Sequence, residues 1–547
     1  MLRGIKSRLH EENYGGLETV LALTLAGTGD EQSLHQWAEE NLISEEEGKD
    51  SFYSWYSEPY SIQGALPLNW KQQFQNGGIK VYRPRFASSW AAKERGSIPS
   101  LAPFFCSLAN TSTRLMIASR AQPDNPGIGP HHPMHILRRN PTVAMRISEA
   151  FRIAFGTDLI LRDGGDIGLS LHCGDRSKID PAEIWFENGV WSIPVIEHQG
   201  DGMRSFAACL MLFFTSPAFV QLIDEPEVFL HPWQTRLLAR ILIEQKSSST
   251  QLIMATHKGD FLRGILDAGA PGLQVVRITR DGPNNRVRSL DAEQIRALWQ
   301  NPVLRYSNVL DGLFHRAVII CEEESDCRFY SAMAEAVMKN RTDRADEDTM
   351  YIACAGKTRI PIVAKALSQF GVRTRVVADF DVLNDEVTIS RIVEALGGCW
   401  NDYTTDWKVI KSTLDQKSPP MMISQVKAQI REVLDAETGP TLTKQAAGRV
   451  RCVLNLTSPW QAAKESGKRA LPGGQVYRAI ERLLLNLNQL GLFVVECGEL
   501  ERFEPSIDGK GAKWVATVLE TRDLAQDPQL EEARRFVSNL LSSLGGD

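Results

Sequence analysis

Short apolar runs alternate with amphipathic stretches along most of the chain after residue 142. The apolar runs lie at 219–223, 252–255, 317–321 and 374–378, and a stretch with helical periodicity follows each of them. Runs that are this short and mostly apolar are typical of buried parallel strands. Strands that alternate with helices predict an α/β fold. We therefore expect two α/β blocks, one after the other.

The periodicity predicts specific elements in each block. In the first we expect a helix from Val143, strands Leu159–Leu161, Ile167–Leu171 and Leu273–Ile278, a hairpin turn at Glu187–Gly189, and helices after Gly202, over Pro232–Gln245 and over Gly259–Leu266. In the second we expect helices Asp326–Met338 and Ile360–Gln369, strand Met350–Ala353, a mainly helical region 382–490 and a last strand Leu492–Val495. Residues 1–142 look irregular. The expected domains are 1–300 and 301–547, with a helical insertion at about 400–490 in the second.

Composition excludes several classes of protein. The 547 residues include 61 Lys+Arg and 67 Asp+Glu, for a net charge of -6, and 43% are hydrophobic. These are values of an ordinary globular protein, which excludes collagen, a long coiled coil and wholesale disorder. The slightly acidic balance argues against binding nucleic acid through overall charge. A DNA partner would need a local basic surface, or metal ions between carboxylates and phosphate.

Cysteine spacing and hydropathy indicate the compartment. The nine cysteines contain no CxxC pair, which argues against both a disulfide framework and a structural zinc site. The N-terminal residues lack the apolar region of a signal peptide, and the longest apolar stretch, Phe206–Ile223, is interrupted by Thr215, Ser216 and Pro217. We expect a cytoplasmic protein without a membrane span.

The first candidate site lies in the first block. Asp224 and Glu225 directly follow the apolar strand 219–223, which is the Walker B pattern, in which the aspartate holds Mg²⁺ and the glutamate polarises the attacking water. His257 follows the next strand, where a switch histidine would contact the γ-phosphate. Gly200, Gly202 and Ser205 precede a helix whose N-terminus could face an anion. Each feature alone is more often an acidic turn, a capping histidine or a simple helix start.

In their order and spacing the three features resemble ATP-binding-cassette ATPases of the chromosome-maintenance kind. The resemblance implies a signature loop at Gly200–Ser205, Walker B at Asp224 and Glu225, a D-loop at 228–232 and a switch at His257. It also implies ATP as cofactor and an ATP-driven homodimer or higher homo-oligomer, because in such enzymes the signature loop of one subunit closes on nucleotide held by another.

One part of that pattern is missing. No GxxxxGK[ST] occurs, and the early glycine-containing text at 13–19 lacks the lysine of a phosphate cradle. Residues 1–9 read as part of a helix that follows such a loop, so our hypothesis is that the chain begins just after its Walker A segment, through a late start or a true loss. The chain as written is then expected to bind ATP poorly.

The second candidate site is a set of acidic residues that follow two apolar strands. Glu322 ends one strand and Asp326 begins the next helix, while Asp379 and Asp381 follow another strand, two residues apart in a segment that we expect to be extended. Converging carboxylates bind Mg²⁺ or Mn²⁺, and two such ions can promote phosphodiester cleavage. The simpler interpretation is a capped helix start and a solvated turn.

Together these acids resemble the TOPRIM domain of topoisomerases, primases and OLD-family nucleases, with Glu323 in place of the usual glycine. A cassette ATPase followed by TOPRIM is similar to the OLD (overcoming lysogenization defect) family, which includes the Gabija nuclease subunit and retron-associated effectors. This resemblance covers roughly residues 140–400. It further implies Glu499 or Glu501 as a late metal ligand, Lys513 as a transition-state lysine and a phosphate contact near Gly356 and Lys357. A solvated strand end, a surface lysine and an ordinary turn remain the alternatives for these positions.

The sequence therefore favours an ATP-regulated, metal-dependent DNA endonuclease. The resemblance implies anti-phage defence and a possible helicase or reverse transcriptase partner. Basic clusters at Lys339, Arg341 and Arg344, and at Lys464, Lys468 and Arg469, are candidates for phosphate contacts or plain solvated faces. Two alternatives stay open. The chain could be a catalytically quiet ATPase-like scaffold, or its TOPRIM-like block could serve strand passage or primer synthesis.

Overall fold

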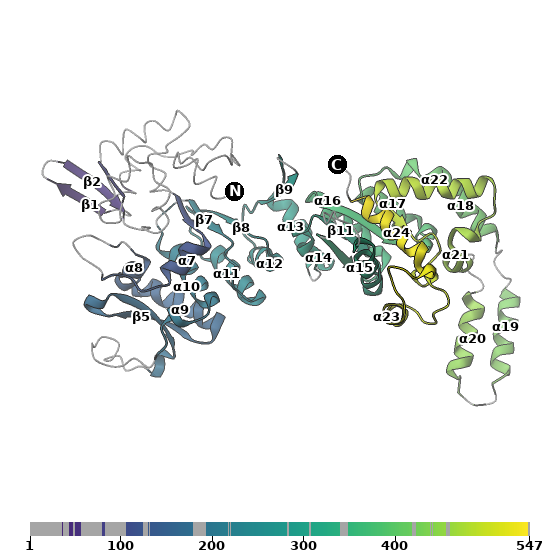
Figure 1. Cartoon of the computed structure of the whole chain (residues 1–547), viewed down its shortest axis with the longest axis horizontal. Coiled ribbons are helices and arrows are strands. Elements are labelled where there is room, and N and C mark those ends of the chain that lie inside the picture. The colour runs from purple at the N-terminus through teal and green to yellow at the C-terminus, as the bar shows by residue number, and fades with distance from the viewer. Residues whose placement is uncertain are drawn as a thin grey trace. The chain divides into compact units, whose positions relative to one another are not determined.

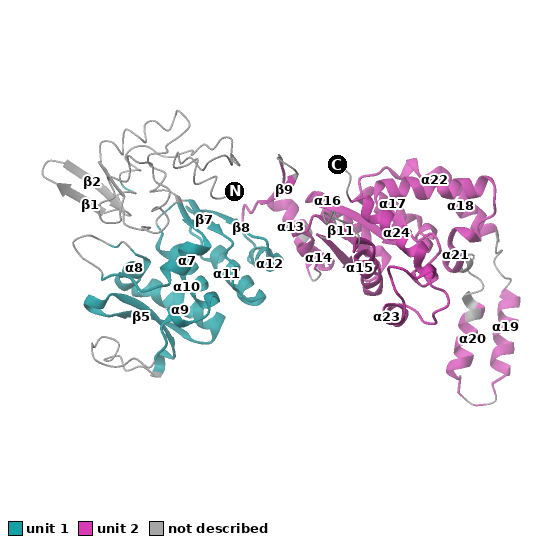
Figure 2. Ribbon diagram, viewed as in Figure 1, with its two compact units in different colours: residues 1–270 teal, residues 271–547 magenta. Residues whose placement is uncertain are grey.

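The chain forms two compact units in a computed structural model (Figures 1 and 2). Unit 1 comprises residues 1–270 and unit 2 residues 271–547, so the division precedes the expected boundary at 300. The structure describes residues 36, 43–47, 50–55, 79–82, 106–123, 130, 132–178, 193–216, 218, 220–281, 284–305, 308–339, 348–417, 423–437, 439, 441–455 and 460–544. Within this part of the chain no helix is long and apolar enough to cross a membrane.

Unit 1 contains a three-stranded parallel sheet in the order β4-β7-β8. Its strands are β4 (Cys106–Ala109), β7 (Val220–Asp224) and β8 (Gln251–Ala255). The helices of this unit are α7 (Thr111–Ile117), α8 (Pro133–Arg139), α9 (Pro141–Phe155), α10 (Asp201–Thr215), α11 (Pro232–Glu244) and α12 (Gly259–Asp267). Helix α10 is apolar on nearly every side, because it is buried against α7, α8 and α9.

Unit 1 also contains two antiparallel sheets. Strands β5 (Asp158–Asp163) and β6 (Leu169–Gly174) pair with each other, and β1 (Ile43–Glu47), β2 (Asp50–Trp55) and β3 (Ile79–Tyr82) form a separate sheet. The region 1–142 was expected to be irregular, yet β4 and α7 lie in it and β4 is the direct neighbour of β7. The expected turn at Glu187–Gly189 lies outside the described residues.

Unit 2 begins with an antiparallel hairpin. Its strands are β9 (Val275–Asp281) and β10 (Asn284–Leu290), and α13 (Ala292–Gln300) and α14 (Pro302–Arg305) follow. We expected the strand at 273–278 to continue the first α/β block. This expectation is wrong, since among the described strands β9 pairs with β10 alone. The guanidinium of Arg277 fastens the hairpin to unit 2 by donating hydrogen bonds to the carbonyl oxygens of Leu313, His315 and Gly371 (2.8–2.9 Å).

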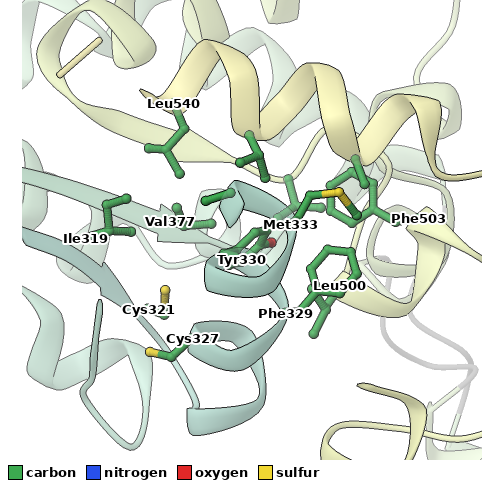
Figure 3. Close-up of a cluster of buried hydrophobic side chains, with 14 of the residues drawn as sticks. Ile319, Cys321, Cys327, Phe329, Tyr330, Met333, Val377, Leu500, Phe503 and Leu540 are labelled. Carbon is green, nitrogen blue, oxygen red and sulfur yellow. The ribbon is translucent and has the colours of Figure 1, made fainter. Parts of the chain in front are cut away.

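The core of unit 2 is a four-stranded parallel sheet in the order β12-β11-β13-β14, which confirms the second α/β block. Its strands are β11 (Ala317–Cys321), β12 (Thr349–Ala353), β13 (Arg373–Ala378) and β14 (Leu492–Val494). Helix α16 (Ile360–Gln369) packs against the sheet, as do α15 (Glu324–Met338), α23 (Ala512–Thr521) and α24 (Glu531–Ser542) through one apolar cluster (Figure 3). Within the cluster Phe329 packs on Trp514, 5.3 Å between ring centroids, and fixes the helix that follows Glu322.

The region between β13 and β14 is mainly helical, as expected. It contains α17 (Glu386–Ala395), α18 (Thr404–Lys417), α19 (Ile423–Asp435), α20 (Lys444–Asn455), α21 (Gln461–Ser466) and α22 (Gln475–Leu490). Helices α18 and α22 pack on each other, and α19 and α20 form a helical pair. Because α22 leads directly into β14, this insertion returns the chain to the sheet beside β13 and brings residues 495–501 next to residues 379–381.

Candidate functional site

Strands β7 and β8 bring the first set of predicted residues together. They run parallel with Asp224 opposite Ala255, and the backbone N–H of Glu225 donates to the carbonyl oxygen of Ala255 (2.9 Å). Since parallel strands end at the same edge of a sheet, Asp224 and Glu225 lie beside the segment that carries His257. The predicted Walker B and switch residues therefore form one half site at this edge.

Glu225 and His257 face each other at the surface of this half site. Oε1 of Glu225 lies 3.2 Å from Nδ1 of His257, and both side chains are about half exposed, at 47% and 53%. Glu225 adopts a φ of +47°, which is costly for a residue with a side chain and is typical of functional turns. An acceptor carboxylate beside an imidazole is suited to orienting a water molecule toward a phosphate.

A third acid, Glu227, forms hydrogen bonds with the segment Thr256–His257. Its carboxylate is fully buried, and Oε1 accepts hydrogen bonds from the hydroxyl of Thr256 (2.6 Å) and from the backbone N–H of His257 (3.1 Å). A buried donor is costly when its acceptor is missing, so these two hydrogen bonds hold the segment in place. We did not predict this role, because the acidic run 224–227 shows no spacing that separates a surface acid from a buried one.

The predicted signature loop divides into two parts. Gly200 caps α10 and has open space around it, and a Cβ on Gly202 would lie 2.6 Å from the carbonyl oxygen of Phe229, so only glycine fits there. Ser205 is fully buried, and its hydroxyl accepts a hydrogen bond from Nε of Arg114 (3.1 Å). The expectation that Ser205 faces a nucleotide is wrong, because one turn into α10 its side chain points into the core.

The second set of predicted residues gathers at the carboxyl edge of the sheet in unit 2. Glu322 and Asp326 follow β11, and Asp379 and Asp381 follow β13, its direct neighbour. The segment after β13 is not extended as expected. A 3-10 helix, Phe380–Asn384, begins there, and the backbone N–H of Phe380 donates to the carbonyl oxygen of Gly498 (2.8 Å). That hydrogen bond ties the two aspartates to the turn after β14.

Burial and mutual repulsion perturb three of these carboxyl groups. Burial, together with nearby carboxylates, raises the pKa of Asp379 well above its ordinary value and that of Asp326 to about 6. The pKa of Glu322 is raised too, by burial and then by the charge of Asp381. Acidic groups that hinder each other's ionisation are stabilised when a cation lies between them, which is the usual condition of a divalent metal site.

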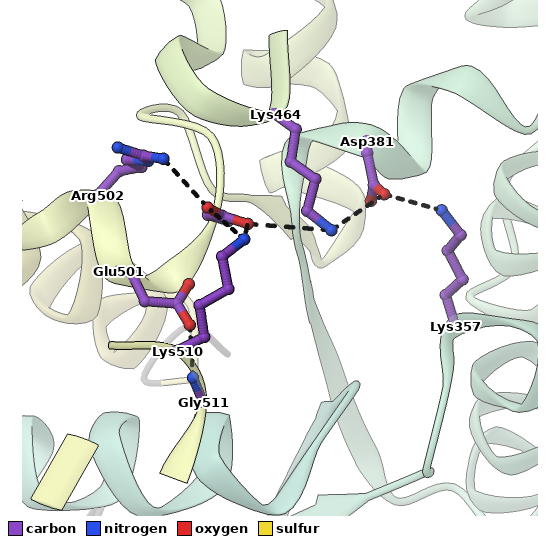
Figure 4. Close-up of polar contacts among 8 residues, drawn as sticks. Lys357, Asp381, Lys464, Glu501, Arg502, Lys510 and Gly511 are labelled. Carbon is purple, nitrogen blue, oxygen red and sulfur yellow. Dashed lines mark hydrogen bonds and ion pairs between the residues drawn. The ribbon is translucent and has the colours of Figure 1, made fainter. Parts of the chain in front are cut away.

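Lysines from two other segments reach Asp381 (Figure 4). Its Oδ2 lies 3.2 Å from Nζ of Lys357, in the turn after β12, and 3.6 Å from Nζ of Lys464, on α21. Although burial lowers the pKa of Lys464, the charges of Asp381, Asp379, Glu499 and Glu322 outweigh it and the pKa is raised. Both cations are positioned to contact a phosphate at the carboxylates.

Glu499 and Glu501 complete the edge on the β14 side. Glu499 is buried, and its carboxylate lies 3.3 Å from Nζ of Lys510 and 4.0 Å from Nζ of Lys464. Oε1 of Glu501 accepts a hydrogen bond from the backbone N–H of Gly511 (2.6 Å). Lys513 is exposed on α23, and among the described contacts the lysines that reach these acids are Lys357, Lys464 and Lys510. The role of Lys513 as the site lysine stays a prediction.

The remaining basic candidates pair with other acids, are exposed or lie outside the described residues. Lys468 pairs with Glu496 and Arg469 with Glu532. Arg341 and Arg344 are not among the described residues, and Lys339 is exposed at the end of α15.

The donor set suits Mg²⁺ or Mn²⁺ because all of its members are carboxylates. Among the described residues, however, no group of three or more His, Cys, Asp or Glu side chains stands close enough together to hold an ion. The expected convergence of four ligands is thus incomplete. One physical reason is that the Asp326 carboxylate accepts a hydrogen bond from the backbone N–H of Glu323 (2.8 Å). Another is that the carboxylate of Asp381 already forms ion pairs with lysines. Glu322, Asp326, Asp379 and Asp381, with Glu499, are the side chains that would hold ions.

Comparison with known proteins finds one matched domain in each of the two units. Residues 122–262 match the family "AAA domain, putative AbiEii toxin, Type IV TA system", and residues 313–381 match "Overcoming lysogenization defect protein-like, TOPRIM domain". The Old nuclease of Escherichia phage P2 is 24% identical over 169 residues, which cover 30% of this chain and 28% of that nuclease. The match thus spans under a third of the curated relative.

Two solved structures match part of the chain at low TM-scores. One is an Smc head bound to the C-terminal winged-helix domain of ScpA, at 14% identity, with 45% of this chain and 75% of that chain covered and a TM-score of 0.28. The other is an Smc head with an extended coiled coil from Pyrococcus furiosus, at 18% identity, 31% and 39% coverage and a TM-score of 0.23. The chain thus contains a stretch similar to an AAA domain followed by a stretch similar to an OLD-like TOPRIM domain, and each stretch includes acidic strand ends.

Proposed function

We propose that the chain is a metal-dependent endonuclease that nicks or cuts duplex DNA. The observation that carries the proposal is the gathering of four acids at one sheet edge, Glu322, Asp326, Asp379 and Asp381. Lys357 and Lys464 reach one of them, Asp381 (Figure 4). Acids with raised pKa values favour a bound cation, and lysines among them favour a phosphate. DNA fits both features, because its phosphate oxygens can bind a metal ion and accept contacts from the lysines.

Each group has a definite role in this proposal. Glu322, Asp326, Asp379, Asp381 and Glu499 would hold Mg²⁺ or Mn²⁺. When bound, such ions activate water and stabilise the leaving oxygen of a phosphodiester. Lys357 and Lys464 would exchange their contacts with Asp381 for contacts with the non-bridging phosphate oxygens and so orient the backbone for in-line attack.

The ATPase domain would regulate access to this site. Asp224 would hold the Mg²⁺ of the nucleotide, Glu225 would orient the attacking water and His257 would contact the γ-phosphate. Gly200 and Gly202, at the start of α10, would present backbone N–H groups to a nucleotide held by a second copy of the chain. We therefore propose an ATP-responsive homodimer or higher oligomer.

Cleavage of supercoiled plasmid tests the proposal. The full chain is incubated with Mg²⁺, Mn²⁺ or EDTA, with and without ATP, and compared with Asp379→Ala. The matched control is Glu394→Gln, which removes an exposed acidic charge from α17 in the same unit. We expect nicking with metal, none with EDTA, loss in Asp379→Ala and full activity in the control.

The other outcomes separate the remaining hypotheses. A folded wild type that cuts under no condition would overturn the nuclease proposal in favour of an assembly scaffold. A covalent adduct between protein and DNA would indicate strand passage instead.

We also propose a role in anti-phage defence, which the resemblance to OLD-family nucleases implies, and it is tested separately. Cells that express the wild type should reduce phage plating relative to cells that express Asp379→Ala, and equal plating would remove the defence role without affecting the nuclease proposal. Co-purification from such cells would identify a helicase or reverse transcriptase partner.

A further inference from the structure

Arg114 is a fully buried arginine at the centre of the ATPase half site. It lies on α7, directly after β4, at 0% exposure, and burial lowers its pKa. Arginine remains a cation even so, because its ordinary pKa lies far above neutrality. A buried charge is expensive unless its donors are satisfied, so the partners of this side chain indicate what it does.

The guanidinium of Arg114 joins three separate elements. Nε donates to the hydroxyl of Ser205 on α10 (3.1 Å), and Nη1 and Nη2 donate to the backbone carbonyl oxygens of Asp224 (2.7 Å) and Glu225 (2.8 Å) at the end of β7. Further bonds reach Ala109 and Thr111 on its own segment. All five acceptors are carbonyl or hydroxyl oxygens, so the rigid fork of donors is used for its geometry and not for an ion pair.

Glu225 depends on this arrangement for its conformation. Its φ of +47° costs about 1–2 kcal/mol for a residue with a side chain, so its surroundings must hold it there. Its N–H is fixed by Ala255, and its carbonyl oxygen accepts from both Arg114 and the N–H of Val228 (3.1 Å). With both ends of the residue held, the carboxylate is directed at His257.

Helix α10 supplies the other end of the connection. Ser205 lies one turn after Gly200 and Gly202, and α7 and α10 pack against each other beside β7 (Figure 1). A displacement of the first turn of α10 therefore acts on the Ser205 hydroxyl, on the guanidinium of Arg114 and on the carbonyl oxygen of Glu225. A side chain that donates hydrogen bonds to two packed elements couples the position of one element to that of the other.

We propose that Arg114 is a positioning residue that couples the first turn of α10 to the backbone of Glu225, so that contact of a second subunit with Gly200 and Gly202 adjusts the hydrolytic glutamate. This inference rests on the proposed function of the ATPase domain. It concerns a residue that precedes the matched stretch 122–262.

Hydrogen exchange tests the coupling without requiring activity. Ser205→Ala removes one acceptor on α10, and exchange is followed by mass spectrometry in the segment 224–231, where the N–H of Val228 reports on the Glu225 carbonyl oxygen. We expect about tenfold faster exchange there, equivalent to about 1.4 kcal/mol and comparable to loss of one hydrogen bond of a charged group. In an Arg114→Met background, Ser205→Ala should have no further effect.

Ser148→Ala is the matched control. Ser148 is also a buried helical serine of unit 1 that accepts a hydrogen bond from the N–H of Leu159 (3.1 Å), and it is not among the hydrogen-bond acceptors described for Arg114. Exchange in 224–231 should be unchanged in this variant. Unchanged exchange in Ser205→Ala, or equal acceleration in both serine variants, would overturn the coupling.

Steady-state ATP hydrolysis separates a positioning role from a merely structural one. Where the wild type turns over ATP, Arg114→Lys should lower kcat by about 100-fold at an unchanged KM, since one ammonium cannot reach both elements and a displacement of about 1 Å costs this much. A change in KM alone would overturn the inference. A wild type without turnover would count against the proposed ATP regulation, while the exchange measurement still decides the coupling.

Discussion

A single methyl group at Gly498 should both destabilise unit 2 and damage its acidic site. Gly498 has a φ of +124°, and a Cβ there would lie 2.2 Å from the backbone carbonyl oxygen of Lys464. Real Cβ atoms keep at least 3.0 Å, so the two backbones must separate by about 0.8 Å, the difference between these distances. The left-handed conformation adds about 1–2 kcal/mol and the displaced packing about 1–3 kcal/mol.

The expected loss for Gly498→Ala is therefore about 3 kcal/mol of folding free energy. In a unit of this size, that lowers the melting temperature by about 6–12 °C. The shift also moves α21, and with it Lys464, away from Glu499 and Asp381, so metal-dependent nicking should fall by about 100-fold. Scanning calorimetry of the full chain in EDTA measures the first effect, and plasmid nicking measures the second.

Two other glycines of unit 2 divide this loss into its parts. Gly397 has a φ of +91° with nothing within 4 Å of an added Cβ, so Gly397→Ala should cost only the conformational part, about 1–2 kcal/mol. Gly473 has open space and no positive φ, so Gly473→Ala should be nearly neutral. If Gly498→Ala melts within about 2 °C of Gly473→Ala, the steric reasoning is wrong.

Three further predictions concern buried titratable groups. Burial lowers the pKa of His172, so the stability that depends on its neutral form is complete above a pH of about 6.5 and is lost as the pH falls below it. His172→Gln should therefore reduce the pH dependence of the melting temperature of unit 1 between pH 7.5 and 5.5. An unchanged slope would contradict this prediction. The pKa of Asp326 is raised to about 6, so its ionisation costs stability as the pH rises through that value. At pH 7.5 in EDTA, Asp326→Asn should melt about 2–4 °C higher than the wild type and should lose nicking activity. A lower melting temperature would refute the predicted direction of the stability change. Glu227→Ala should lower the stability of unit 1 by about 3 kcal/mol, because two hydrogen bonds to a buried carboxyl oxygen are lost and their donors are left without that acceptor. Exposed Glu244→Ala should lower the stability little, and equal effects of the two variants in calorimetry would argue against the role of Glu227.

The chain by itself determined the position of the chemistry along each strand. An apolar run that ends in acids predicts a buried parallel strand with its carboxylates at one edge, and β7, β11 and β13 all follow this rule. Hydrophobic alternation and the chemistry of a strand end are local properties, so Asp224, Glu322 and Asp379 could be found without knowledge of the fold. The order of the two blocks is local information in the same sense.

Tertiary packing alone decided which distant residues complete each site. Arg114 follows a strand that we did not predict, and its role depends on contacts with α10 and β7, which lie about one hundred residues further along the chain (91–111 residues in these hydrogen bonds). Lys464 reaches both Asp381 and Glu499 only because the helical insertion returns the chain to β13, with Gly498 fitted against Lys464. Burial likewise separates Glu227 and Ser205 from their exposed neighbours, since it depends on the elements packed around a residue and not on the residues beside it in the sequence.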